Sequence, residues 1–181
     1  DRKARQSRRY AVARRIAGLF ASYARERPRL LADWENGVPS DGLGETLPDD
    51  FLWQPVLWRR TVELVRERHG VDESVIERHR RVLDELSSGA KELDLPQRLS
   101  FFGYTRLAEA ERELVVALGA CRDLHLWLPH PSPQLWADLE GEATTGARAD
   151  DRTARHAKHP LLATLGRDVR ELQAVLSTDG V

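Results

Sequence analysis

Apolar side chains recur at intervals of three and four residues in several stretches of the chain, a spacing that places them on one face of an α-helix. The first stretch, residues 4–26, carries Ile16, Phe20 and Tyr23 on that face. The sequence predicts further helices over residues 30–34, 55–68, 73–86 and 107–119, a short one within 132–140, and a last one that begins near residue 160. The chain is therefore expected to be mainly helical.

The pattern changes after Pro96, where an aromatic-rich run from Leu99 to Tyr104 is typical of a β-strand. A second strand is predicted from Asp123 to Pro129. Because a helix of about a dozen residues separates these strands, they are expected to run parallel as a βαβ unit. The predicted fold class is mainly α with a small parallel β element. Residues 1–92 would form a helical subdomain and 93–181 part of an α/β domain, with a mobile loop at about 141–158.

Composition narrows the functional classes. The net charge is −1, which argues against a uniformly polycationic DNA-binding chain, and the single cysteine excludes an internal disulfide and a multi-cysteine zinc site. We expect no metal site. No apolar stretch is long enough to span a bilayer. The chain contains no methionine and shows no secretory signal. It is expected to be an internal piece of a longer cytoplasmic protein.

Charge is unevenly distributed, however. Residues 1–27 contain nine basic residues and two acidic ones. On a helical wheel, Arg5 and Arg9 extend the apolar stripe of the first predicted helix toward its N-terminus, so the stripe becomes cationic there. Such arginines would meet an acidic neighbour, water or a phosphate backbone. The alternative interpretation is a simple solvated helix end.

Five short segments, taken in order, resemble the RecC family of exodeoxyribonuclease V gamma subunits. They are Ala-Arg-Arg-Ile-Ala-Gly-Leu-Phe-Ala-Ser-Tyr (13–23), Arg-Pro-Arg-Leu-Leu-Ala-Asp-Trp (27–34), Trp-Gln-Pro-Val-Leu-Trp-Arg (53–59), Leu-Pro-Gln-Arg-Leu-Ser-Phe-Phe-Gly (95–103) and His-Pro-Leu-Leu-Ala-Thr-Leu-Gly-Arg-Asp (159–168). Each segment is weak alone, but their order and spacing resemble that family across nearly the whole chain.

The resemblance implies the fold of a UvrD-type helicase that has lost its ATPase residues. Residues 1–92 would be a 1B-like helical insertion, and residues 93–181 a partial RecA-like domain of the P-loop-helicase-like type. Phe102 and Gly103 then occupy a degenerate Walker B position, where an active motor has a carboxylate for Mg²⁺. The chain also lacks the Gly-x-x-x-x-Gly-Lys-Ser/Thr phosphate loop. No cofactor is expected here, because ATP and Mg²⁺ would bind in partner motor subunits.

The same resemblance implies a non-catalytic scaffold that guides DNA strands during double-strand break repair and recombination. Its expected partners are a RecB-like helicase–nuclease, a RecD-like subunit, and DNA as single strands and duplex ends, with no membrane. The candidate DNA contacts are Arg5, Arg8, Arg9 and Arg15. A protein-interaction module without DNA contact and an active helicase or nuclease fragment remain as alternatives. Trp34, Trp53 and Trp58 are expected in the core rather than as base-stacking platforms.

Overall fold

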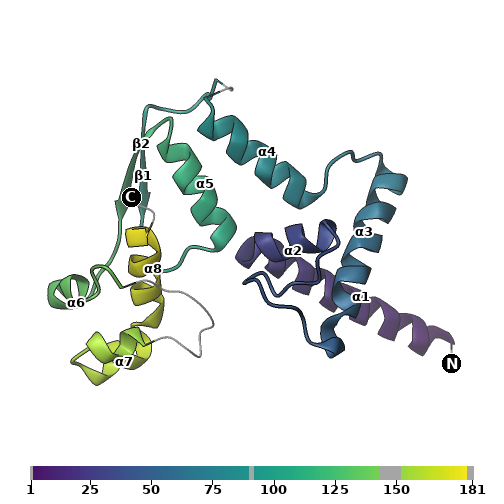
Figure 1. The fold of residues 1–181 in the computed structure, drawn as a ribbon, viewed down its shortest axis with the longest axis horizontal. Coiled ribbons are helices and arrows are strands. Elements are labelled where there is room, and N and C mark those ends of the chain that lie inside the picture. Colours follow the sequence, from purple (N-terminus) through teal and green to yellow (C-terminus); the bar gives the residue numbers. More distant parts are fainter. Residues whose placement is uncertain (1, 90–91, 143–151, 179–181) are drawn as a thin grey trace. The chain divides into compact units, whose positions relative to one another are not determined.

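The computed structural model describes residues 2–89, 92–142 and 152–178, with side chains from residue 8 onward in the first helix and up to residue 176 in the last. The described elements are mainly helical with one small sheet (Figure 1). The chain forms two compact units. The N-terminal unit comprises residues 1–84 with 108–111, and the C-terminal unit comprises residues 85–107 with 112–181. The predicted division at residue 92 stays a prediction.

The N-terminal unit is built from four helices whose predicted existence is confirmed, with bounds that differ by a few residues. They are α1 (Arg2–Glu26), α2 (Pro28–Glu35), α3 (Trp53–His69) and the start of α4 (Val75–Ser87), with a single 3₁₀ turn, η1 (Asp49–Phe51), before α3. Gly70 ends α3 in the left-handed conformation, with a φ of +59°. Glycine accepts that geometry without steric cost, which explains why the helix ends there.

A cluster of aromatic rings forms the core of this unit. Phe20 of α1 lies 5.3 Å from the ring centroid of Trp58 on α3, and 6.5 Å from that of Trp34 on α2. Both contacts are edge-to-face, an arrangement that aromatic pairs favour. The expectation that Trp34 and Trp58 are core residues is confirmed. For Trp53 it is wrong: this side chain starts α3 and is 46% exposed, because Gln54 and Pro55 point inward at that turn.

A polar network beside the rings joins three helices. Glu35, the last residue of α2, accepts hydrogen bonds from the Trp58 indole nitrogen (3.1 Å) and from the Ser74 hydroxyl (2.9 Å). Ser74 also accepts from the backbone N–H of Glu77 (3.0 Å), and the Glu77 carboxylate accepts from the backbone N–H of Ser74 (2.6 Å). This reciprocal pair is a capping box, with Ser74 as the N-cap of α4. Glu77 is also paired with Arg66 of α3.

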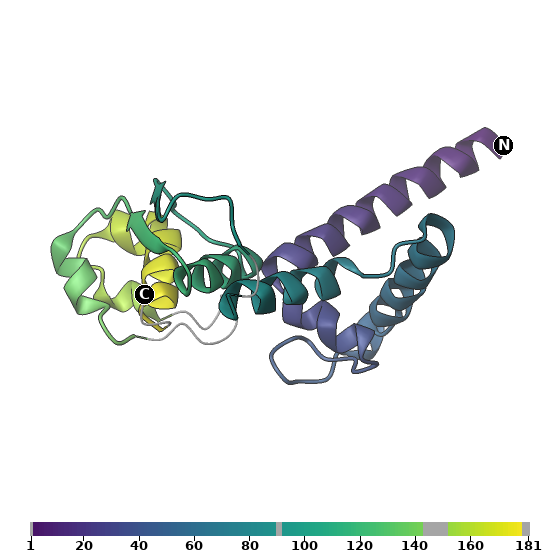
Figure 2. The same ribbon diagram turned by 90° about the horizontal axis from the view of Figure 1, so that it is seen from above.

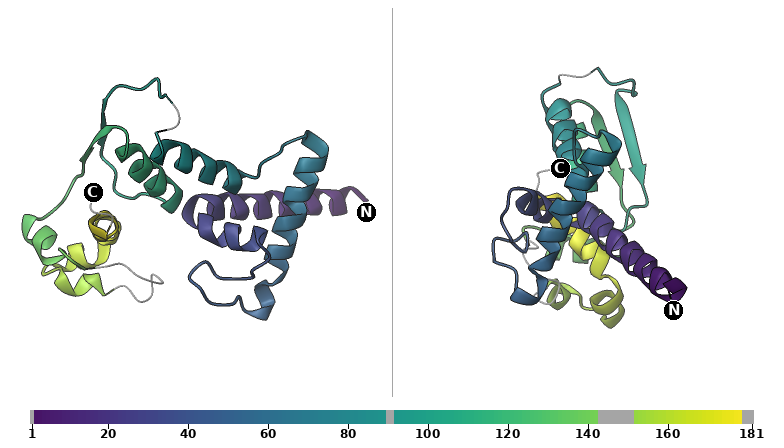
Figure 3. Two further views of the ribbon diagram at one scale, coloured as in Figure 1. Left: turned by 45° about the horizontal axis from the view of Figure 1, so that its top comes forward. Right: turned by 90° about the vertical axis from the view of Figure 1, so that its right-hand side faces the viewer.

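The C-terminal unit contains a two-stranded parallel sheet, as predicted. Strand β1 (Arg98–Phe102) pairs with β2 (Asp123–Trp127), with Arg98 opposite Asp123 and Phe102 opposite Trp127 (Figure 3, right). Helix α5 (Glu109–Gly119) connects the strands. In the part of the chain that the structure describes, no further strand joins either edge of this sheet.

Short helices complete the unit. They are α6 (Pro133–Asp138), the 3₁₀ turn η3 (Thr153–His156), α7 (Pro160–Leu165) and α8 (Arg167–Thr178). Most of the expected mobile loop, residues 143–151, lies outside the described residues, whereas its later part contains η3. The expectation of one continuous helix from residue 160 is wrong, because the helix stops at Leu165 and a new one begins at Arg167. A β-carbon at Gly166 would lie 2.7 Å from the carbonyl oxygen of Leu162, so this close approach requires glycine.

Arg170 holds this break together. Its side chain is 1% exposed and donates to the Thr153 hydroxyl (3.1 Å) and to the carbonyls of Leu162 and Ala163, the latter at 3.0 Å. These carbonyls belong to the last turn of α7 and have lost their helical partners. A guanidinium at the negative end of a helix satisfies them and complements the dipole.

Replacement of Arg170 by alanine is predicted to destabilise the C-terminal unit by about 3 kcal/mol or more, because buried carbonyls and a hydroxyl lose their donor. Denaturant unfolding followed by circular dichroism, with hydrogen exchange of α7 and α8 amides, measures this effect. Arg152→Ala, at an exposed position nearby, serves as the control and should change stability by less than about 0.5 kcal/mol. Equal stability of the two variants would contradict the prediction.

Because Glu35 is partly buried, the stability of the N-terminal unit depends on whether this side chain is charged. Desolvation raises the pKa of Glu35 above its ordinary value, outweighing the bonds from Ser74 and Trp58 that lower it. A carboxyl group with a raised folded pKa disfavours folding when ionised, and this cost disappears as the pH falls through the folded pKa toward the unfolded one. Glu35→Gln removes the charge and keeps both hydrogen bonds, because the amide can accept from Trp58 and donate to Ser74.

We therefore predict that Glu35→Gln is at least as stable as the natural chain at pH 7, and that the advantage shrinks as the pH is lowered. Glu35→Ala should instead lose about 1–3 kcal/mol at every pH, because the buried Trp58 N–H loses its acceptor. Urea unfolding of both variants between pH 4 and pH 8 checks the two effects. If the difference in free energy of unfolding between Glu35→Gln and the natural chain did not change with pH, the titration of Glu35 would not be its cause.

Candidate functional site

The candidate nucleic-acid contacts of the sequence lie on α1, and the structure separates them into different positions. Arg8 and Arg9 border a groove between α1 and α3, whereas Arg15 is exposed on α1 and does not line that groove. Arg5 lies in α1, but its side chain is outside the described part of the structure. Among the described residues, Arg8, Arg9 and Arg15 make no hydrogen bond or ion pair.

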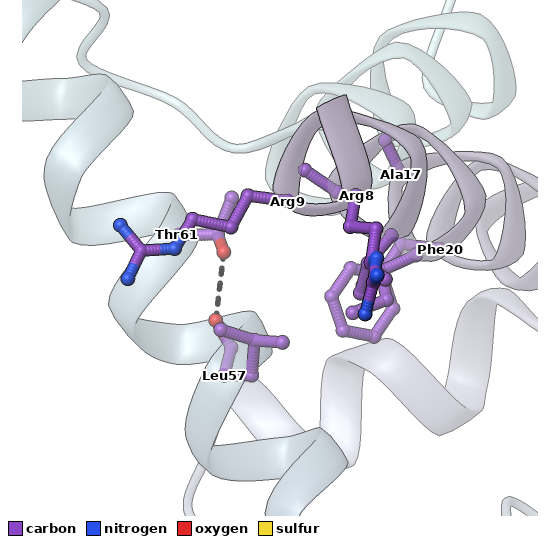
Figure 4. A pocket seen from close by; sticks show the side chains of 9 residues that line it. Arg8, Arg9, Ala17, Phe20, Leu57 and Thr61 are labelled. Carbon is purple, nitrogen blue, oxygen red and sulfur yellow. Dashed lines mark hydrogen bonds between the residues drawn. The ribbon is translucent and has the colours of Figure 1, made fainter. Parts of the chain in front are cut away.

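The groove has a volume of about 550 Å³. It runs along α1 and uses α3 as one wall, and its lining consists of two arginines, one threonine and six apolar side chains: Arg8, Arg9, Val12, Ala13, Ile16, Ala17, Phe20, Leu57 and Thr61. Seven of these nine residues come from α1, between residues 8 and 20, which spans roughly 18 Å of helix. The close-up shows that Arg9 extends from α1 toward α3 beside Thr61, while Arg8 lies on the side away from α3 (Figure 4).

The helix pattern explains why the groove is apolar at one end and basic at the other. Ile16 and Phe20 continue into the aromatic core, where Phe20 is 5% exposed. Val12, one turn closer to the N-terminus, is 57% exposed, and Arg9 lies a further three residues toward the N-terminus on the same side of the helix. The N-terminal half of α1 extends past the rest of its unit (Figure 2). Sequence reasoning identified the cationic end of the stripe, but it missed the groove, which depends on how α3 packs against α1.

The carboxyl end of the parallel sheet is the second location of interest, because ligands of parallel α/β sheets bind outside that edge. Here β1 ends at Phe102 and β2 at Trp127, and their rings are stacked nearly parallel, with an interplanar angle of 5° and a centroid distance of 5.7 Å. Phe102 is 70% exposed and Trp127 51%. Gly103 follows with a φ of +76°, and its N–H donates to the Trp127 carbonyl (3.0 Å).

The carboxyl edge of this sheet therefore presents an exposed aromatic surface formed by Phe102 and Trp127. The strand expected at Leu99–Phe102 is confirmed, while the assignment of Phe102 and Gly103 to a degenerate Walker B position stays a prediction. The described residues contain no cluster of three or more histidine, cysteine, aspartate or glutamate side chains able to hold a metal ion. Among the described helices, none is both long enough and apolar enough to cross a membrane.

Comparison with known proteins places these features in a family. The family described as "RecC, N-terminal domain" matches residues 2–180. The chain is 51% identical over 172 residues to the RecBCD enzyme subunit RecC of Mycolicibacterium smegmatis, covering 95% of this chain and 14% of that protein. It is 53% identical over 175 residues to the same subunit of Mycobacterium tuberculosis H37Rv, covering 95% of this chain and 15% of the relative.

A more distant relative is the RecBCD enzyme subunit RecC of Escherichia coli K12. It is 27% identical over 172 residues, covering 94% of this chain and 15% of that protein. The chain thus spans about one seventh of the length of the curated relatives it matches.

Proposed function

The chain belongs to the RecC family, matching its N-terminal domain, and on that premise we propose that it is a non-catalytic scaffold and strand-guiding part of a RecC subunit. The relatives are named as subunits of the RecBCD enzyme. The proposed setting is the corresponding exodeoxyribonuclease V, an ATP-dependent helicase–nuclease acting in double-strand break repair and recombination in the cytoplasm. Its proposed partners are a RecB-like and a RecD-like subunit together with single-stranded DNA and duplex ends.

The observation that carries the strand-guiding role is the set of α1 arginines without partners among the described residues. Arg8 and Arg15 are seven positions apart, so they lie on one side of α1 about 10 Å from each other. Phosphate groups of a single strand would satisfy such a row without reading its sequence. Arg5 and Arg9 form a second row, four positions apart, and complete the proposed set of contacts.

The non-catalytic part of the proposal rests on the aromatic pair at the carboxyl edge of the sheet. Magnesium binding in nucleotide hydrolysis needs carboxylate oxygens held near the β- and γ-phosphates. The rings of Phe102 and Trp127 supply none. The proposal therefore assigns ATP and Mg²⁺ to the motor subunits of the complex.

An active helicase or nuclease fragment is the competing proposal from the enzyme class. It requires that the chain hydrolyse ATP or cleave DNA, and that the activity be lost when one carboxylate is replaced. The discriminating measurement is phosphate release from Mg-ATP with and without single-stranded DNA. Turnover that a single Asp→Asn or Glu→Gln substitution removes would replace the scaffold proposal with the catalytic one.

For the strand-guiding role we predict that Arg8→Gln combined with Arg15→Gln weakens binding of a fluorescent oligothymidylate. Log affinity falls with log salt concentration, and each lost phosphate contact on a single strand makes this slope shallower by about 0.7. The slope of the double variant should therefore be shallower by about 1.4. Fluorescence anisotropy across a salt series measures the slope. Arg5→Gln combined with Arg9→Gln tests the second row in the same way.

Arg68→Gln combined with Arg78→Gln is the matched control, because both side chains are exposed on the same unit but lie on α3 and α4. It removes the same net charge and should leave the slope nearly unchanged. Equal loss in this control would mean that binding depends on overall charge alone. Salt-independent binding, or none, would favour a protein-interaction module without DNA contact.

A further inference from the structure

The exposed half of α1 has more apolar surface than a solvated helix end requires. Residues 8–15 are all exposed, and they include Val12 at 57% and Tyr10 at 69%. Most stability of a helix in a protein comes from packing an amphipathic face, and an unpacked stretch of this length is marginal in water. The groove beside Val12 therefore offers a face on which a further element would stabilise α1.

The chemistry of the groove favours a protein ligand over a nucleobase. Apart from the two arginines, its one polar side chain is Thr61, whose hydroxyl already donates to the Leu57 carbonyl at 2.8 Å (Figure 4). Base edges would find no hydrogen-bonding partner on such a floor. Stacking needs an accessible ring face, and the one ring in the lining, Phe20, is 5% exposed. Aliphatic side chains fit this lining best.

Charge specifies the ligand further. Arg8 and Arg9 stand on different sides of the groove and have no partner among the described residues (Figure 4). An apolar segment that carried basic residues would be repelled by both guanidinium groups. One that carried carboxylates beside its apolar face would gain a charge-assisted hydrogen bond to each. The complementary ligand is thus apolar in the middle and acidic at its edges.

We propose that the groove between α1 and α3 binds an amphipathic helix of a partner protein. Apolar side chains at three- and four-residue spacing would pack against Val12, Ile16 and Leu57, and carboxylates on the helix flanks would pair with Arg8 and Arg9. The lined length of roughly 18 Å accommodates about three turns of such a helix. This binding site is different from the proposed strand-guiding surface. Arg15 does not line the groove, and the strand-guiding proposal does not use the apolar lining residues Val12, Ile16 and Leu57.

The test uses the 181-residue chain and a pair of fluorescent helical peptides of about 15 residues, roughly four turns. Both carry leucines at helical spacing; one has glutamates on the flanks, and its twin has lysines. We expect the glutamate peptide to bind at low salt in fluorescence anisotropy, and the lysine twin to bind at least about tenfold more weakly because charge complementarity is reversed.

Substitutions then locate the peptide. Val12→Gln should weaken binding of the glutamate peptide about tenfold, because it removes the free energy gained when the valine side chain is buried by the peptide. Val56→Gln is the matched control: Val56 is 60% exposed on α3, does not line the groove, and should leave affinity unchanged. Arg9→Gln should weaken binding severalfold at low salt and much less at high salt, whereas Arg14→Gln, away from the groove on the same helix, should have no effect.

Any of the following results would overturn the proposal. They are no binding of the glutamate peptide, equal binding of its lysine twin, equal losses in Val12→Gln and Val56→Gln, or concentration-dependent dimers that Val12→Gln abolishes, which would make the occupant a second copy of this chain. Loss of oligothymidylate affinity in Val12→Gln would also overturn it, by making the groove a nucleic-acid site. Failure of the strand-guiding role alone changes none of the peptide results.

Discussion

The N-terminal unit depends on one half-buried acceptor, the side chain of Glu35. It receives hydrogen bonds from Trp58 on α3 and Ser74 before α4 while it lies at the end of α2. A buried donor without its acceptor is costly, so these helices are held in one arrangement by more than apolar contact. Because Phe20 packs edge-on against Trp58, the same constraint sets where α1 meets α3. The groove between those helices therefore depends on a hydrogen-bond acceptor, Glu35, that does not line it.

Helix α1 has a packed half and an exposed, basic half. Its C-terminal half ends in the aromatic core through Phe20 and Tyr23, where large side chains supply the burial that stabilises the unit. Its N-terminal half carries Val12 and the arginines in exposed positions. Substitutions of exposed side chains away from special features usually change stability little. Substitutions in the exposed basic half are therefore expected to leave the fold intact.

The sequence alone could predict features that rest on local rules. The Ser-x-x-Glu spacing of Ser74 and Glu77 and the position of Gly70 after an apolar stretch are sufficient to locate both helix ends. Features that depend on contacts between distant residues could not be found in this way. The break at Gly166 is stabilised by Arg170, whose partner Thr153 is 17 residues earlier. Likewise, Arg9 lines a groove only because α3 lies beside α1. The periodicity of the sequence indicates which face of α1 is apolar, but not which element packs against that face.

The aromatic pair at the sheet edge differs physically from a magnesium-binding site. A magnesium-binding carboxylate favours solvent and ions, whereas the rings of Phe102 and Trp127 favour burial. Parallel sheets normally have both faces covered, so an exposed pair at their carboxyl ends favours packing against a further element rather than a nucleotide. An acid introduced at residue 102 would not by itself supply nucleotide hydrolysis, because this sequence contains no phosphate loop with its lysine. An edge that carries these two rings is suited to packing rather than to holding Mg²⁺, which is consistent with the proposed scaffold role.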